Sequence, residues 1–96
     1  MLTGKQKRYL RSKANQLKAI FQVGKDGVNE NMVKQIDEAL EKRELIKVSV
    51  LQNCLEDKQD VAEQLADETT AYIVQIIGNN IVLYKESTNN KQIQLP

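Results

Sequence analysis

Residues 19–43 contain an apolar run, a turn bracketed by two glycines and a helical pattern, and this succession constrains the fold most. The run Ala19–Val23 has the length and composition of a β-strand. It stops at the turn Gly24-Lys25-Asp26-Gly27, whose glycines permit positive φ angles. Asn29 is a favourable N-cap, and apolar side chains then recur at helical spacing up to Arg43. They are Met32, Val33, Ile36, Ala39 and Leu40, which we expect in the core.

The rest of the chain continues this alternation of helices and strands. A first helix is predicted from Thr3 to about Leu17, with Leu10, Ala14 and Leu17 on its apolar stripe. Further elements are a strand at Leu45–Leu51 with Ile46, Val48 and Val50 buried, a helix at about Asp57–Thr69, and strands at Ala71–Ile77 and Ile81–Tyr84 joined by Gly78-Asn79-Asn80. The sequence predicts a two-layer α+β fold in the order α-β-α-β-α-β-β, with three helices on a mixed four-stranded sheet. Residues 1–96 form one domain, in which 85–96 is a polar, partly ordered tail.

The composition excludes several classes of protein. Apolar residues make up 41% of the chain and charged residues 28%, as in ordinary globular proteins. No apolar run approaches the roughly 20 residues that span a bilayer, and no signal-peptide region follows Met1, so we expect a cytoplasmic protein without a membrane partner. Histidine is absent, which removes the commonest general base and metal ligand. We therefore expect no enzyme, catalytic residue, metal or cofactor, and we expect the single cysteine, Cys54, to be buried.

The small net charge of +1 conceals a strong separation of charge along the chain. Residues 1–25 carry seven of the fourteen basic side chains and no acid, whereas residues 26–96 carry the other seven and all thirteen acids. The basic residues are Lys5, Lys7, Arg8, Arg11, Lys13, Lys18 and Lys25. A basic segment of this kind attracts polyanions such as RNA, although a solvated helix without a partner can have the same composition.

The turn Gly24–Gly27 is a candidate phosphate-binding loop. Its glycines would let the backbone approach a bulky ligand, and the N-terminus of the following helix would present unpaired N–H groups and a partial positive charge. Asp-Gly is also a common turn dipeptide, so the tetrapeptide alone favours a purely structural turn, and only the charge around it favours phosphate binding.

The third predicted helix has a strongly acidic outer face. Its carboxylates are Glu56, Asp57, Asp60, Glu63, Asp67 and Glu68. Such a face repels nucleic acid, so we expect it to lie away from an RNA-binding surface. An alternative function is that of an adaptor, which would dock a basic protein through this helix.

Four separated motifs occur in a fixed order along the chain. They are Leu2-Thr3-Gly4-Lys5-Gln6-Lys7-Arg8-Tyr9-Leu10-Arg11, Val23-Gly24-Lys25-Asp26-Gly27, Leu45-Ile46-Lys47-Val48, and Ile76-Ile77-Gly78 to Leu83-Tyr84. Together they resemble the YhbY/CRM family. The resemblance extends from residue 2 to the Ile93–Pro96 tail. It implies a fold like that of the C-terminal domain of translation initiation factor three, and a Gly-x-x-Gly loop at Gly24–Gly27 like that of KH domains. Asn15 and Ala19 depart from the family, which often has histidine and proline there.

The resemblance implies an RNA-binding protein that acts during assembly of the large ribosomal subunit. The expected partners are large-subunit ribosomal RNA, the pre-ribosomal particle and ribosomal proteins. Residues expected to contact RNA are Lys5, Lys7, Arg8, Arg11, Lys18, Gly24, Lys25, Asp26 and Gly27. Tyr9 could stack on a base, but its position on the first helix favours packing against the core.

Overall fold

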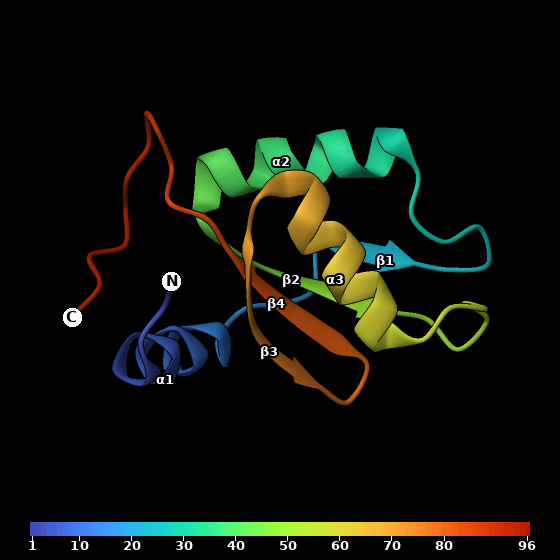
Figure 1. The fold of residues 1–96 in the computed structure, drawn as a ribbon, viewed down its shortest axis with the longest axis horizontal. Helices are drawn as coiled ribbons and strands as arrows, with labels where there is room; N and C mark the ends of the chain where they lie inside the picture. The colour runs from blue at the N-terminus through green and yellow to red at the C-terminus, as the bar shows by residue number, and fades with distance from the viewer.

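A computed structural model describes all 96 residues. Its elements are α1 (Gly4–Ala14), β1 (Phe21–Val23), α2 (Glu30–Arg43), β2 (Leu45–Val50), α3 (Lys58–Thr69), β3 (Tyr72–Ile77) and β4 (Asn80–Tyr84) (Figure 1). The predicted α+β class, with three helices and four strands in the order α-β-α-β-α-β-β, is confirmed.

The four strands form one mixed sheet in the spatial order β1-β2-β4-β3. β1 pairs in parallel with β2, because α2 carries the chain back across the sheet between them. β4 lies between β2 and β3 and is antiparallel to both. β4 therefore occupies the centre of the sheet, as its unbroken apolar sequence favours, while β1 forms an edge.

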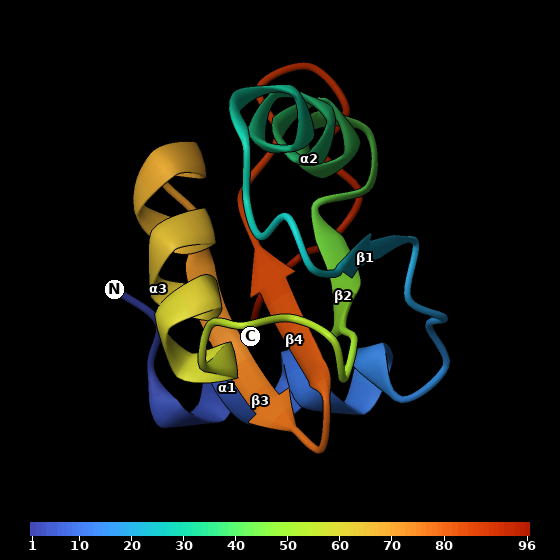
Figure 2. The same cartoon turned by 90° about the vertical axis from the view of Figure 1, so that its right-hand side faces the viewer.

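Helices cover both faces of the sheet, and this corrects the expectation of two layers. On one face α2 and α3 pack over a core that includes Ile46, Val48 and Ile81. On the other face α1 packs over a second core that contains Leu10, Ala14, Leu45, Val74, Val82, Tyr84 and Ile93. Successive residues of β4 alternate between the two cores, since side chains along a strand point to opposite faces. Figure 2 shows α1 and α2 on opposite sides of the sheet. The sheet is thus the middle of three layers.

Local capping chemistry fixes where the first two helices begin. The Thr3 hydroxyl accepts from the Gln6 N–H and the Gln6 side chain accepts from the Thr3 N–H, a reciprocal capping box at α1. The predicted N-cap Asn29 is confirmed, because its side chain accepts from the N–H of Met32. α1 ends at Ala14 rather than near Leu17, and β1 begins at Phe21 rather than Ala19. The connection between α1 and β1 is accordingly longer than predicted.

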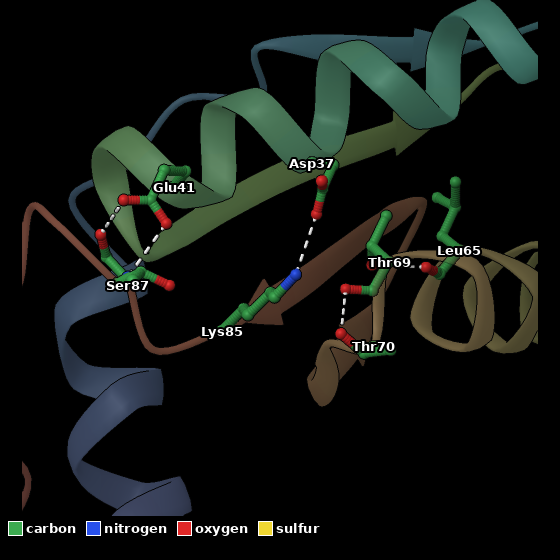
Figure 3. Close-up of polar contacts among 8 residues, drawn as sticks. Asp37, Glu41, Leu65, Thr69, Thr70, Lys85 and Ser87 are labelled. Atoms are coloured by element: carbon green, nitrogen blue, oxygen red, sulfur yellow. Dashed lines mark hydrogen bonds and ion pairs between the residues drawn. The ribbon is translucent and has the colours of Figure 1, made fainter.

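The C-terminal segment has no regular structure but is firmly attached to α2. Glu44, 0% exposed and with φ of 64°, accepts hydrogen bonds from the N–H groups of Ser87, Gln92 and Ile93 at 2.6–2.7 Å. One turn earlier, Glu41 accepts from the Ser87 hydroxyl at 2.6 Å (Figure 3). Ile93 is buried in the core beneath α1, so the segment completes one face of the fold.

These hydrogen bonds lower the pKa values of both carboxyl groups. Burial alone would raise the pKa of Glu44, but its three backbone N–H donors outweigh this effect and the pKa falls. The Ser87 hydroxyl, with the N–H groups of Thr88 and Asn89, lowers the pKa of Glu41 from its ordinary 4.5 to about 2. Both residues therefore hold the C-terminal segment as carboxylates.

Four predicted core positions are more peripheral than expected. Met32, Val33, Ala39 and Cys54 are only half-buried and pack at the margin of the core beneath α2 and α3. The predicted burial of Ile46, Val48 and Val50 is confirmed. No helix is both long enough and apolar enough to cross a membrane.

Candidate nucleic-acid interface

The Gly24–Gly27 segment forms a closed turn beyond the end of β1. The Gly27 N–H donates to the Gly24 carbonyl at 3.0 Å, and Gly27 has φ of 66°, a conformation that favours glycine. Lys25 and Asp26 at its tip are exposed. The following helix begins at Glu30, and the side chain of its N-cap Asn29 already accepts a hydrogen bond from the Met32 N–H. Gly24 is half-buried and Gly27 is buried, so the turn exposes only Lys25 and Asp26, with a helix N-terminus three residues beyond Gly27.

The turn rests on the connection between β2 and α3, which supplies an acid. Leu51 and Asn53 lie against Gly24, and the Glu56 carboxylate lies directly over the α-carbon of Gly27. We expected the acidic residues of the third helix to lie away from the candidate loop, and for Glu56 this expectation is wrong. The position of Glu56 depends on how the β2–α3 connection packs against the turn, and the sequence gives no local signal for that contact.

Helix α1 presents its cations to solvent. Lys5, Lys7, Arg8 and Arg11 are exposed, while Leu10 and Ala14 on the other side of the helix are 0% and 1% exposed. None of the seven basic residues in 1–25 makes an ion pair, because the only salt bridges join Lys85 to Asp37 and Lys91 to Glu86. The positive charge of α1 is therefore left uncompensated.

The connection between α1 and β1 brings further cations together. Lys18 lines a shallow cleft of about 180 Å³ with Arg43, from the end of α2, and Lys47, from β2. The Lys47 ammonium donates to the Leu17 carbonyl at 3.0 Å, which fastens the connection to the sheet. Lys13 and Arg43 line an adjoining cleft, so Lys13, Lys18, Arg43 and Lys47 form what we term the edge cluster. Sequence spacing could not reveal this cluster, since its members come from four separate segments.

The predicted site residues fall into two groups rather than one compact site. Helix α1, which carries the first group, packs on one face of the sheet, and the Gly24–Gly27 turn lies at the opposite end of the molecule's long axis (Figure 1). Lys18 lies on the connection between these groups and belongs to the edge cluster. Any ligand that contacts both groups must therefore be extended along the β1 edge.

Tyr9 has a packing role in this structure. It is half-buried against the core beneath α1, and the Lys13 ammonium lies 5.4 Å from the centre of its ring. A cation at this distance interacts favourably with the ring face. The interpretation of Tyr9 as a packing residue is thus favoured over base stacking.

The chain is similar to known proteins along its whole length. The family model described as the CRS1 / YhbY (CRM) domain matches residues 2–85. "Probable RNA-binding protein YqeI" of Bacillus subtilis is 73% identical over 96 residues, which cover 100% of both chains. A protein of Haemophilus influenzae named "RNA-binding protein" is 40% identical over 95 residues, covering 99% of this chain and 95% of that protein. A solution structure is known for SAV1595, a hypothetical protein of Staphylococcus aureus that is described as an RNA-binding candidate. It matches this chain with 61% sequence identity over 100% of both chains and a TM-score of 0.83.

Proposed function

Because the chain belongs to the CRS1/YhbY (CRM) domain family, we propose that it binds RNA through the basic residues of α1 and the Gly24–Gly27 turn. One observation carries the proposal. All seven basic side chains of residues 1–25 are exposed and free of ion pairs. The names of relatives in Bacillus and Haemophilus, which describe RNA binding, support the same conclusion.

In the proposed mechanism the two groups of residues contact successive parts of the sugar-phosphate backbone. Arg8 and Arg11 can each grip a phosphate with two N–H groups, while Lys5 and Lys7 act as mobile point charges. At the turn, Lys25 and the exposed backbone of Lys25 and Asp26 approach another phosphate, while Gly24 and the buried Gly27 set the shape of the turn. Lys18 lies between the two groups. These contacts position the RNA but do not select its sequence.

The proposed RNA is that of the large ribosomal subunit, bound in the cytoplasm within an assembling particle. The resemblance to stand-alone YhbY proteins motivates this assignment. The proposed role is binding without catalysis, in keeping with the absence of histidine from the chain.

The test compares two variants of the turn that differ only in charge. Gly27→Asp and Gly27→Asn introduce side chains of nearly the same size, and both residues tolerate a positive φ better than most. If the turn contacts phosphate, Gly27→Asp should weaken binding to large-subunit ribosomal RNA fragments severalfold more than Gly27→Asn. Equal affinities in two folded variants would remove the turn from the interface.

The same assay tests α1. Lys7→Glu/Arg11→Glu should lower affinity strongly, whereas the control Lys34→Glu/Lys91→Glu, which changes the net charge equally outside residues 1–25, should lower it much less. Equal loss in the two double variants would show that total charge alone governs binding. Preference for a ribosomal fragment over a scrambled RNA of equal length tests the proposed substrate.

A second candidate function, that of a protein adaptor, is favoured by the exposed acids of α3. Asp60, Glu63, Asp67 and Glu68 are exposed and make no salt bridge. The variant Glu63→Gln/Asp67→Asn separates the two functions. Loss of association with ribosomal particles, with unchanged affinity for RNA, favours the adaptor. If the variant keeps both its association with the particles and its affinity for RNA, the adaptor is contradicted.

A further inference from the structure

A groove of about 450 Å³ runs between the edge strand β1 and the N-terminal half of α2. Its volume lies within the range of about 300–1,000 Å³ that is usual for ligand sites. Three of its apolar side chains are Ile20, Phe21 and Met32, and Ile20 is 42% exposed. Since β1 is an edge strand paired only with β2, the outer backbone of this strand also borders the groove.

The polar side chains of the groove are all carboxamides. They are Gln22, Asn29, Asn31 and Gln35, and no lysine, arginine or carboxylate lines the groove. Asn29 is engaged as the cap of α2, whereas the amide groups of Gln22, Asn31 and Gln35 make no hydrogen bond. A free carboxamide offers both a donor and an acceptor, the combination that pairs with the edges of nucleobases.

The ends of the groove lead to positive charge. Ile20 also lines the cleft that contains Lys18, Arg43 and Lys47, so the groove adjoins the edge cluster. Beyond Gln22, the strand continues through Val23 into the Gly24–Gly27 turn with its exposed Lys25. A neutral groove flanked by unpaired cations complements a polymer whose backbone is anionic and whose side groups are flat, neutral and polar.

We propose that this groove takes unpaired nucleobases of single-stranded RNA whose phosphates lie on the edge cluster and the Gly24–Gly27 turn. The inference rests on the proposed RNA binding and adds to it a place where base identity is read. The apolar walls contact the faces of the bases, and Gln22, Asn31 and Gln35 bond their edges. In this arrangement, the residues that bind phosphate provide affinity, and the groove discriminates among the nucleobases.

The test measures affinity for single-stranded RNA of about ten nucleotides, as each of the four homopolymers and as a ribose-phosphate oligomer of the same length without bases. The natural chain should bind its preferred homopolymer about tenfold or more tightly than the oligomer without bases. Asn31→Leu/Gln35→Leu should reduce that ratio and the differences among homopolymers, and should leave affinity for the oligomer without bases unchanged. The matched control Gln94→Leu, which removes an exposed carboxamide from the C-terminal segment, should change neither.

A second measurement does not depend on substitution. The side-chain amide NMR signals of Asn31 and Gln35 should shift on addition of the preferred homopolymer, and should shift much less with the oligomer without bases. Equal affinity of the wild-type protein for the preferred homopolymer and for the oligomer without bases would show that bases do not occupy the groove. An unchanged ratio of these two affinities in Asn31→Leu/Gln35→Leu would show the same, and the occupant of the groove would then be a protein partner. Failure to bind any of these oligomers or ribosomal RNA overturns the proposed function as well.

Discussion

Substitution of Glu44 by glutamine should destabilise the protein by removing the centre of its C-terminal attachment. One carboxylate oxygen accepts from Gln92 and Ile93 and the other from Ser87. In Glu44→Gln an amide donor replaces one oxygen, so at least the buried Ser87 N–H loses its acceptor, at a cost of about 1–3 kcal/mol. The other two bonds lose the benefit of a charged acceptor, about 1 kcal/mol each. The neutral glutamine avoids the cost of burying a charge, which offsets part of this loss in stability.

The expected net loss in the free energy of unfolding is about 2–3 kcal/mol at neutral pH. Urea unfolding followed by circular dichroism measures it, with Glu38→Gln as control. Glu38 lies on the same helix, is exposed and makes no hydrogen bond, so its replacement should change stability by less than about 0.5 kcal/mol. A loss of less than about 0.5 kcal/mol for Glu44→Gln would refute the reasoning.

The pH dependence of this difference provides a second check. The folded pKa of Glu44 is lowered, so its stabilisation is fully present above the unfolded value and is lost as pH falls through the folded value. Protonated Glu44 resembles glutamine. The gap in stability between wild type and Glu44→Gln should therefore narrow on acidification below pH 4.5, and a constant gap would contradict the assignment.

Two further predictions concern the turn and the second carboxylate. Gly27→Ala should lower the free energy of unfolding, measured by thermal denaturation, by about 1–2 kcal/mol, because alanine is strained at a positive φ and its methyl group would displace Glu56. Gly24→Ala should lower it less, and equal losses in the two variants would contradict the turn geometry. The pKa of Glu41 is lowered to about 2, so its contribution is present above pH 4.5 and is lost between pH 4.5 and about 2. Glu41→Gln should flatten the acid part of the stability profile over that window, and an unchanged profile would refute the role of Glu41.

The elements of this fold were predictable because their signals are local. The capping residues Thr3 and Asn29 begin their helices as expected, and the turn after Ile77 forms the predicted hairpin with Gly78 at φ of 56°. These features depend on residues within a few positions of one another. Periodicity also identified the apolar stripe of α1, but not the face of the sheet on which it packs.

The features that the sequence did not reveal depend on contacts between distant segments. Glu44 looks like an ordinary charged residue at the end of a helix, and only the path of the C-terminal segment makes it a buried acceptor. In the sequence Arg43 marks only the end of a predicted helix, yet in the structure it joins Lys18 at the β1 edge. The groove is likewise formed by two elements whose separation no local pattern encodes.

The most direct test of the central claim is the salt dependence of RNA affinity. If four to six of the free cations of residues 1–25 neutralise phosphates, the logarithm of the association constant should fall against the logarithm of salt concentration with a slope of about −3 to −5. In Lys7→Glu/Arg11→Glu the slope should become shallower by about 1.5. A slope near zero, or one that this double variant leaves unchanged, would contradict binding of RNA phosphates by the basic helix.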